Sequence, residues 1–543
     1  MESDRSESNN NISLTEDQRK IYNELIKFIT IESKKKELLV IGYAGTGKTT
    51  LIAKFINDAI KNKLCKKIVI AAPTHKAVNI AKSKLFSNIN SNETLSNRIN
   101  IMTVHRLLNY KSYIDLNGNK YFAKNNSCSA NWNIYNLIVV DECSMLSNQI
   151  INDIQTQLEE PNLKVKIIYV GDPAQLPPVN QLNSEIFEKN IKKLYLDKIV
   201  RTKNMKIMEL SNDHRKWILS EKEEDIPEIC KYTSKNIKIY SSEHNQRNIW
   251  LDKFISLLNK ELKVDDNIIE NNNIILTWTN NKCNIYNKYI REKIFNKKDL
   301  DYFEIGEILI FNDFYRIEKK IDVKKDDEKV DDNTIEYDNF YTSEQVKLID
   351  IKKVRYKFNK LLYKINNNLP VKINEKFKKC INNLNKLLDT EIDIYEMKIN
   401  KLSDIKVGSM TEIYEIFSIH PDSNKVYNSV LEEFENYISK VKSKCYNIIN
   451  ELTNTDNMKK CIYQSELEKK INNLYKNWQD LVVDKFAQLN YGYSITVHKS
   501  QGSTFMNVFT DILDILGNNN QQETSKCLYT AITRSSKRLY LLI

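Results

Sequence analysis

Glycine is scarce in this sequence, with 10 residues in 543, or about 2% where a globular protein ordinarily has about 7%. Proline and histidine are also rare, at 8 and 6 residues. Because glycine and proline are needed only where the backbone takes an unusual conformation, their few positions mark the loops with special geometry. Three of the ten glycines fall between Gly42 and Gly47, which makes that loop the first candidate for a site.

Long apolar runs and paired cysteines are absent too. No apolar run approaches the roughly 20 residues of a membrane span, and residues 1–13 are polar and acidic, unlike a signal peptide. We therefore expect a disordered tail at 1–13 and no membrane partner. The nine cysteines include no C-x-x-C pair, so we expect free thiols and no zinc site. Free thiols favour a reducing intracellular compartment, which could be the cytoplasm, a viral replication site or the nucleus. A net charge of +11 permits a polyanionic partner.

The residues around the glycine-rich loop predict a strand, a loop and a helix. Leu38 to Ile41 is a short apolar run typical of a buried parallel strand, and Leu51 to Ile60 has a helical pattern. Between them, GYAGTGKT fits G-x-x-x-x-G-K-[ST] at every fixed position. Backbone N–H groups of such a loop can wrap a triphosphate, so we expect ATP, with Mg²⁺ on the Thr49 hydroxyl. The expected nucleotide-binding residues of the loop are Gly42, Ala44, Gly45, Thr46, Gly47, Lys48, Thr49 and Thr50.

Two further strands end in carboxylates and an amide. Leu137 to Glu142 is a strand that opens with a four-residue apolar run and ends in Asp141 and Glu142, which predicts Mg²⁺ binding by Asp141 and activation of the attacking water by Glu142. Ile167 to Val170 is followed by a loop that contains Gln175, whose amide could sense the γ-phosphate.

Small polar residues follow other predicted strands. Ile68 to Ala72 leads into Pro73-Thr74-His75, and Thr103-Val104-His105 ends another extended piece. Carboxyl ends of strands are where open α/β sheets bind ligands, so these side chains suit contacts with nucleic-acid phosphates. The alternative is that they cap helices.

Gln18 has two interpretations. Leu14 opens an amphipathic helix to about Ile31, and Thr15 with Gln18 three residues later forms a capping box. A glutamine just before a phosphate loop could instead read an adenine edge.

Tyr110 to Ala123 predicts a β-hairpin, because Asn117-Gly118 is the preferred pair for a two-residue turn. Both faces of this hairpin carry apolar or aromatic side chains. Since so small a hairpin cannot bury both faces by itself, one is expected to dock on its domain and the other to face a partner, such as a base pair being split.

The segments in chain order resemble the superfamily 1 helicases, and within them the 5′-to-3′ subfamily of RecD-like and Pif-like enzymes. The first half carries the likeness in GYAGTGKTT, AAPTHKA, TVH, VVDECSM, VGDPAQLPPV and VRTK. The second half carries it in LTWTNNKCNIYNKYIREKIF, ITVHKSQGSTF and LYTAITRSSKRL. The likeness covers about residues 14–320 and 470–543.

The resemblance implies an α/β fold of two RecA-like domains with parallel sheets, ATP in the cleft between them, and single-stranded DNA and duplex junctions as partners. It places Gln18 on adenine, Gly502 near the nucleotide, and Arg201 and Arg534 as arginine fingers on the γ-phosphate, where planar guanidiniums suit the spreading charge. Its DNA contacts correspond to Pro73, Thr74, His75, Thr103, His105, Asn280, Thr496 and His498. The wedge of a strand-separating pin corresponds to Tyr113, Tyr121 and Phe122.

The expected domains follow from the same likeness. The first RecA-like domain spans 14–200 with the pin at about 107–125, and the second spans 201–300 and 481–543. Residues 301–480 form an insert, with Phe303 to Phe311 and Gln345 to Ile351 as strands of an SH3-like module. Lys352 to Lys401 has thirteen Lys/Arg against five Asp/Glu and is expected to be a helical insert. Its basic face is either solvated or contacts the DNA backbone or a replication or repair partner.

The sequence therefore predicts an ATP-dependent DNA helicase that translocates 5′ to 3′ and unwinds duplexes at the hairpin. Two alternatives stay open: an RNA helicase, and a P-loop ATPase that clamps nucleic acid without unwinding it.

Overall fold

A computed structural model gives the fold of the chain. It describes residues 14–31, 35–86, 98–114, 120–124, 132–178, 181–198, 204–220, 227–263, 273–318, 337–362, 364–402, 412–453 and 456–543. The chain divides into two compact units. Unit 1 comprises Met1–Lys111, Lys124–Lys298 and Gly492–Ile543, and unit 2 comprises Ser112–Ala123 and Asp299–Tyr491.

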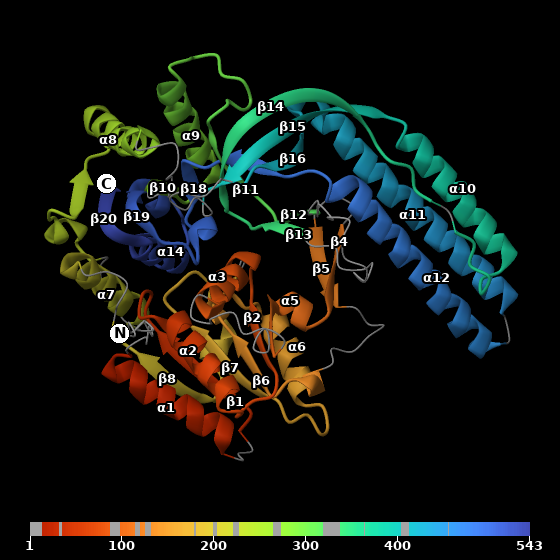
Figure 1. The fold of residues 1–543 in the computed structure, drawn as a ribbon, viewed down its shortest axis with the longest axis horizontal. Helices are drawn as coiled ribbons and strands as arrows, with labels where there is room; N and C mark the ends of the chain where they lie inside the picture. Colours follow the sequence, from red (N-terminus) through yellow and green to blue (C-terminus); the bar gives the residue numbers. More distant parts are fainter. Residues whose placement is uncertain are drawn as a thin grey trace, which may run out of the picture. The chain divides into compact units, whose positions relative to one another are not determined.

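The first lobe of unit 1 is built on a six-stranded parallel sheet in the order β3-β2-β6-β7-β1-β8 (Figure 1). Side chains of β1 alternate between its faces: Leu38 and Val40 pack with α1 and α2, whereas Leu39 and Ile41 pack with α6. Both faces are therefore covered, as a parallel sheet requires. The strands are β1 Glu37–Gly42, β2 Ile68–Ala72, β3 Ile99–Thr103, β6 Leu137–Val140, β7 Lys166–Gly171 and β8 Lys192–Leu196; the helices are α1 Glu16–Thr30, α2 Lys48–Lys61, α3 His75–Phe86, α5 Val104–Leu107 and α6 Asn148–Leu158.

The second lobe of unit 1 is a five-stranded parallel sheet in the order β18-β10-β19-β20-β9 (Figure 1). Two sequence segments more than 200 residues apart form it, because β10 pairs with both β18 and β19. The expectation of two parallel-sheet domains is thus confirmed. The strands are β9 Ile237–Tyr240, β10 Asn273–Thr277, β18 Ser494–Thr496, β19 Phe505–Asp511 and β20 Ser535–Leu542; the helices are α7 Met205–Leu219, α8 His244–Lys263, α9 Asn280–Phe295, α13 Ile512–Leu516 and α14 Gln521–Thr533.

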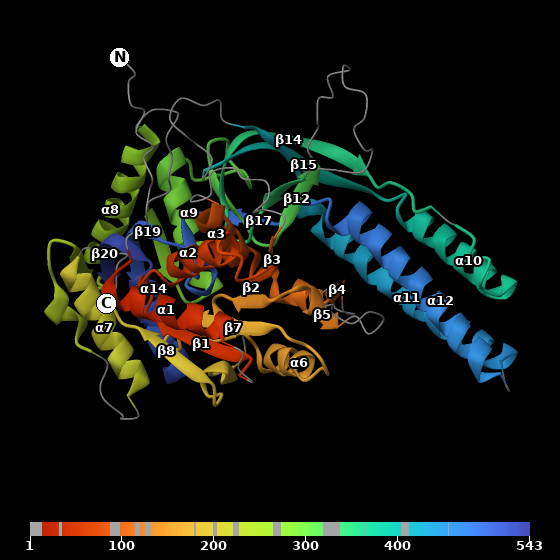
Figure 2. The same ribbon diagram turned by 60° about the horizontal axis from the view of Figure 1, so that its bottom comes forward.

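Unit 2 combines an antiparallel sheet, in the order β16-β15-β14-β11-β17, with a bundle of three helices (Figure 2). The long strands β14 and β15 pair along their length and lead into α10. We call the three helices the arm. The strands are β11 Ile308–Phe311, β12 Tyr315–Glu318, β13 Tyr337–Phe340, β14 Gln345–Lys357, β15 Glu391–Lys401, β16 Tyr414–Ile419 and β17 Leu489–Tyr491; the helices are α10 Val371–Leu387, α11 Asn424–Leu452 and α12 Asn457–Trp478.

The expectation of a helical insert over 352–401 is wrong at both ends. β14 continues to Lys357 and β15 begins at Glu391, so only the middle of the segment is helical. The reason is visible around Ile392 and Ile394, which are buried in the arm's core while their neighbours are not. That period of two is typical of a strand. The strand expected from Phe303 also begins later, at Ile308, because Gly306 takes a φ of +87° just before it. The SH3-like module stays a prediction.

The predicted hairpin is present as β4 Tyr110–Ile114 and β5 Lys120–Lys124, which form a two-stranded sheet. Its expected turn, Asn117-Gly118, lies outside the described residues, as do the side chains of Tyr113, Tyr121 and Phe122.

Within the described part of the chain, no helix is both long and apolar enough to cross a membrane. Eight cysteines in that part are free thiols, and no group of three or more His, Cys, Asp or Glu side chains there is arranged to hold a metal ion.

Candidate functional site

The glycine-rich loop turns directly from β1 into α2. Gly45 and Gly47 have φ values of +84° and +79°, which a residue with a Cβ adopts only under strain. Lys48 is buried, and its Nζ donates hydrogen bonds to the carbonyl oxygens of Gly42 at 2.8 Å and Tyr43 at 3.0 Å. The loop is therefore shaped for close approach of a ligand to backbone N–H groups, with one amine held at its mouth.

Two oxygen ligands meet beside this loop. Thr49 Oγ1 donates a hydrogen bond to Asp141 Oδ2 at 3.1 Å, so the first turn of α2 touches the end of β6. Hydroxyl and carboxylate oxygens are the donors that Mg²⁺ prefers, and Mg²⁺ usually keeps several waters as well. Thr49 and Asp141 thus fit the ion that a nucleotide would bring.

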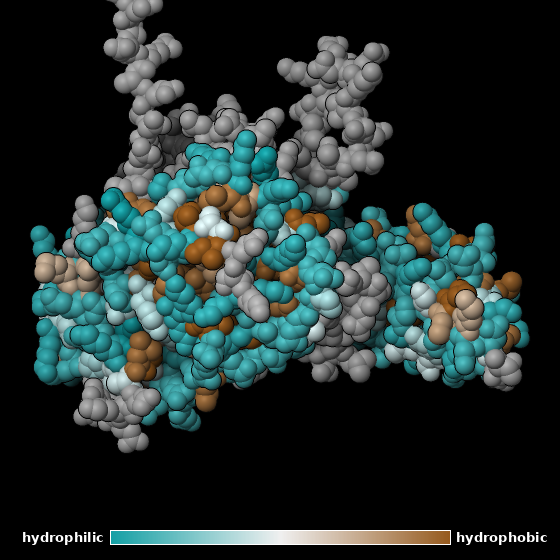
Figure 3. Space-filling model, turned by 90° about the horizontal axis from the view of Figure 1, so that it is seen from below, coloured by the Kyte–Doolittle hydropathy of each residue, from teal (hydrophilic) through white to brown (hydrophobic). Residues whose placement is uncertain are grey.

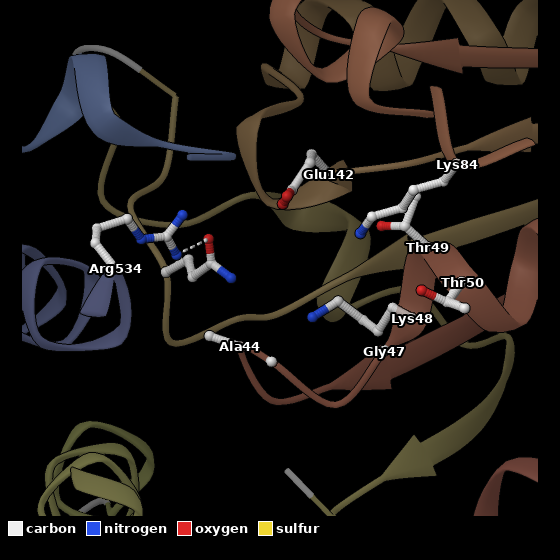
Figure 4. Close-up of a pocket in the computed structure, with 10 residues that line it drawn as sticks. Ala44, Gly47, Lys48, Thr49, Thr50, Lys84, Glu142 and Arg534 are labelled. Carbon is white, nitrogen blue, oxygen red and sulfur yellow. Dashed lines mark hydrogen bonds between the residues drawn. The ribbon is translucent and has the colours of Figure 1, made fainter. Parts of the chain in front are cut away.

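Glu142 has a left-handed backbone, with φ +52° and ψ +42°. This conformation is costly for a residue with a side chain and persists where the surroundings enforce it, often at functional sites. Its N–H donates to Asp141 Oδ1 at 2.9 Å, which helps to hold the turn. Figure 4 shows the Glu142 carboxylate pointing into the cavity in front of the loop.

Burial, and then repulsion from Glu142, raise the pKa of the Asp141 carboxyl to about 6. A raised pKa in the folded state means that stability is lost as the pH rises through that value. We predict that Asp141→Asn, whose oxygen can accept from the Glu142 N–H and whose NH2 group can donate to Thr49 Oγ1, raises the melting temperature of the nucleotide-free protein at pH 7.5 by on the order of 2–4 °C. The difference should shrink towards pH 5. Thermal unfolding without Mg²⁺ across this range measures it, and a difference independent of pH would contradict the assignment.

The second lobe supplies the opposite wall. Arg534, at the end of α14, is only 1% exposed. Its guanidinium donates to the carbonyl oxygens of Thr530 at 3.1 Å and Ser503 at 3.3 Å. It also reaches Gln175 Oε1 at 3.5 Å, at the outer limit of a hydrogen bond. The guanidinium is therefore aimed before any ligand arrives.

Both lobes line one cavity of about 220 Å³ (Figure 4). Arg534 thus lies across the cavity from Lys48. Its role as an arginine finger, which the resemblance implies, stays a prediction. Arg201 falls within 199–203, outside the described residues. The lining residues are Ala44, Gly45, Gly47, Lys48, Thr49, Thr50, Lys84, Glu142, Gln175 and Arg534.

Gln18 holds the loop from behind. Its Oε1 accepts from the Thr15 N–H at 3.1 Å, which confirms the capping box, and its Nε2 donates to the Thr46 carbonyl oxygen at 3.0 Å. The adenine contact stays a prediction. Gly502, with φ +77°, lies against Ile80 of α3 rather than among the lining residues of the cavity. Its contact with the nucleotide stays a prediction.

The candidate nucleic-acid residues follow the carboxyl ends of strands in both lobes. Pro73, Thr74 and His75 follow β2, and Thr103 ends β3. The hydroxyls of Thr74 and Thr103 accept from the N–H groups of Ala77 and Arg106, so both also act as helix caps. The capping alternative is thus realised for these two threonines, and contacts with nucleic acid stay a prediction.

Two histidines near these ends are held neutral. Burial lowers the pKa of His105, which packs edge-on against Tyr110. Burial also lowers the pKa of His498, against the opposing effect of Glu523 at 3.6 Å. Neutral rings suit stacking or hydrogen bonding more than charge neutralisation. In the second lobe, Thr496 is buried at the end of β18 and Asn280 is exposed at the start of α9.

Sequence reasoning missed four residues of this region. Lys84 lines the cavity, and Asp172, Arg215 and Tyr529 form buried contacts beside Ala44 in its wall. Asp172 and Tyr529 lie inside segments that carried the family likeness, VGDPAQ and LYTAITR. Lys84 and Arg215 carry no local signal, because only the packing of α3 and α7 brings them here.

Comparison with known proteins fits this geometry. The family model of an AAA domain matches residues 27–181, and that of a UvrD-like helicase C-terminal domain matches residues 491–542. The RecD subunit of the RecBCD enzyme of Buchnera aphidicola (Schizaphis graminum) is 27% identical over 520 residues. The match covers 92% of this chain and 69% of the length of RecD. The chain belongs to the RecD-like branch of the superfamily 1 helicases.

Other relatives of this helicase-family chain differ in coverage. An uncharacterized protein, R530, of Acanthamoeba polyphaga mimivirus is 31% identical over 540 residues, covering 96% of this chain and 98% of its own. The ATP-dependent DNA helicase dda of Enterobacteria phage T4 is 25% identical and covers 57% of this chain and 64% of its own. A solved Pif1 helicase from Bacteroides with ADP-AlF3 and single-stranded DNA is 14% identical, covers 98% of this chain and 92% of its own, and has a TM-score of 0.43. The family relationships support an ATP-dependent DNA helicase.

Proposed function

We propose that this protein is an ATP-dependent DNA helicase that moves 5′ to 3′ along single-stranded DNA and separates duplexes at the β4–β5 hairpin. The observation that carries the proposal is the cavity in which Lys48, Glu142 and Arg534 converge from two lobes. Such an arrangement suits phosphoryl transfer, where catalysis consists of positioning and charge stabilisation.

Each side chain has a distinct part in this proposal. Lys48 would exchange its backbone carbonyl partners for phosphate oxygens, and Glu142 would orient and deprotonate the attacking water. Arg534 would meet the charge that spreads over the equatorial oxygens. Mg²⁺ held through Thr49 and Asp141 would neutralise charge on the β- and γ-phosphates. Because Arg534 comes from the other lobe, hydrolysis would release one lobe from the other.

This release can move DNA because the candidate nucleic-acid residues follow strands of both sheets. Alternating grip by the lobes then advances the strand, with the hairpin as a wedge. Two other functions use the same cavity: unwinding of RNA, and clamping of nucleic acid without unwinding.

Paired assays separate these functions. ATP hydrolysis is measured with DNA and RNA oligonucleotides of one sequence, and unwinding is measured on duplexes with a 5′ or a 3′ single-stranded tail. We expect stimulation by DNA and unwinding only from the 5′ tail. Stimulation by RNA alone would favour the RNA helicase, and hydrolysis that no single strand stimulates would favour the clamp.

The hairpin gives a prediction that separates unwinding from hydrolysis. Phe122→Ala or Tyr121→Ala should lower the unwinding rate several-fold more than DNA-stimulated hydrolysis, because aromatic side chains stack on bases at about 1–3 kcal/mol each. The two rates are measured on the same enzyme preparation, so the hydrolysis rate is the internal control. Equal loss of both rates would argue against a wedge.

The arm gives a prediction on salt dependence. Its helix α10 carries exposed lysines with little opposing charge, whereas α11 has four Lys and four Glu. Hydrophilic side chains predominate over the part of the arm seen in Figure 3. If α10 contacts the DNA backbone, Lys378→Gln with Lys379→Gln should reduce the slope of log affinity against log salt by about 0.7 per lost phosphate contact.

Lys440→Gln with Lys444→Gln on α11 is the matched control for the arm, since both lysines are exposed. Fluorescence anisotropy with a labelled single strand at several salt concentrations measures the slopes. Identical slopes for the two double variants would leave the basic face of α10 as a solvated surface.

A further inference from the structure

A closed ring of buried contacts surrounds Asp172, the residue that follows β7. The Tyr529 hydroxyl, on α14, donates to Asp172 Oδ2 at 2.8 Å and accepts from the Ala44 N–H at 3.2 Å. Tyr529 is 1% exposed and Asp172 is fully buried. One hydroxyl of the second lobe therefore joins the phosphate loop to the loop after β7.

Arg215, on α7, completes the ring. Its Nε donates to Asp172 Oδ1 at 3.3 Å, and its guanidinium lies 3.6 Å from the centre of the Tyr43 ring. Because Tyr43 precedes Ala44, the contacts return to the phosphate loop where they began. Tyr529 also packs with Ala44 and Ala174 in a small apolar cluster.

The chemistry of the ring favours one arrangement. A fully buried carboxylate is costly without a partner, and Arg215 supplies the charge that balances Asp172. Burial, and then the charge of Asp172, raise the pKa of the Tyr529 phenol well above its usual value, so the phenol stays protonated and donates. Each buried group is thus satisfied by a specific neighbour, which fixes the geometry.

The ring touches the cavity at both walls. Ala44 and Gln175 both line the cavity. Ala44 belongs to the ring, and the Gln175 N–H donates a hydrogen bond to the Asp172 carbonyl oxygen at 3.1 Å. Tyr529 lies five residues before Arg534, about one and a half helical turns. A change in the position of the phosphate loop relative to Asp172 would therefore move α14, the helix whose C-terminal end carries the guanidinium.

We propose that Tyr529 is a positioning residue for hydrolysis, which couples occupation of the phosphate loop to the placement of Arg534. By holding the Ala44 N–H and the Asp172 carboxylate together, it sets the separation between the loop and α14. A phosphate that takes the Ala44 N–H releases one of the two bonds and so shifts α14. This inference rests on the proposed function, because it requires ATP hydrolysis in this cavity.

The test begins with Tyr529→Phe, which keeps the ring and removes the hydroxyl. We expect kcat for DNA-stimulated hydrolysis to fall about 10- to 100-fold while KM for ATP changes by less than about twofold, since displacement of a catalytic group costs rate rather than binding. Tyr286→Phe is the matched control. It also removes a buried tyrosine–aspartate hydrogen bond, to Asp511 at 2.5 Å, but that bond lies wholly within the second lobe. Its kcat should stay within about twofold of wild type.

A double variant shows whether Tyr529 acts through Arg534. In an Arg534→Ala background, Tyr529→Phe should lower kcat no further, because the group it positions is gone. Arg215→Lys, which keeps the charge beside Asp172 and loses the flat guanidinium over Tyr43, should lower kcat with the same dependence on Arg534. If thermal unfolding shows that Tyr529→Phe does not fold, Arg215→Lys replaces it in the test.

Two outcomes would overturn the inference: equal kcat values for Tyr529→Phe and Tyr286→Phe, or an undiminished effect of Tyr529→Phe in the Arg534→Ala background. A wild-type protein that hydrolyses no ATP would overturn the proposed function instead.

Discussion

Lys48→Ala is expected to lower ATP hydrolysis by at least about 10²–10³-fold, which in most assays is complete loss. The amine is the only charged group that the phosphate loop contributes to the cavity lining. It is buried and held by two backbone carbonyl oxygens at the wall of the cavity, so its charge acts on a phosphate at short range. Its loss removes stabilisation just where charge develops on the phosphates.

Steady-state hydrolysis with saturating single-stranded DNA measures this effect. Lys54→Ala is the matched control, because it makes the same change on the same helix in a side chain that pairs with Asp58. It should hydrolyse ATP at the wild-type rate. Hydrolysis by Lys48→Ala at more than about a tenth of the wild-type rate would mean that the cavity is not the site of the reaction.

Strands β1, β2, β6 and β7 could be predicted from the sequence because each is a short apolar run followed by a distinctive loop, whereas β8 and β9, at the edges of the two sheets, have no such run. Ile68 to Ala72 is predicted to the residue because its signal is local, whereas the strand predicted over Leu137 to Glu142 ends two residues earlier, at Val140. The convergence of Lys48 and Arg534 followed only from the family resemblance. No pattern in the sequence states that residues almost 500 positions apart face each other.

Local signals failed where tertiary contacts decide the structure. Residues 352–401 were expected to form one helical insert, but the alternation of buried Ile392 and Ile394 makes the segment's last part a strand. Gln18 shows a different limit. Its capping role could be predicted, whereas its bond to the Thr46 carbonyl depends on the placement of α1 against the phosphate loop. The strained backbone of Glu142 has no sequence signal, because glutamate rarely adopts it.

Arg534→Ala is expected to lower kcat by about 10³-fold or more with little change in nucleotide affinity, which is the range for an arginine finger. The carbonyl oxygens of Thr530 and Ser503, in the same lobe, orient the guanidinium towards the cavity and Gln175. The phosphate loop therefore does not depend on Arg534 to bind the nucleotide before the reaction. Binding of a fluorescent ADP analogue should therefore survive. Affinity for ADP with aluminium fluoride, which mimics the transferring phosphoryl group, should fall in parallel with kcat.

Arg534→Lys separates charge from shape in this prediction. Lysine keeps a positive charge but lacks the planar fork that meets two oxygens at once, so it should recover only a small part of the lost rate. Because Arg534 is 1% exposed, thermal unfolding of both variants must first show that the fold is intact. If Arg534→Ala weakened ADP binding as much as it slowed hydrolysis, the guanidinium would be a binding residue. If it left kcat unchanged, the two lobes would not complete one active site, and a motor driven by their closure would lose its physical basis.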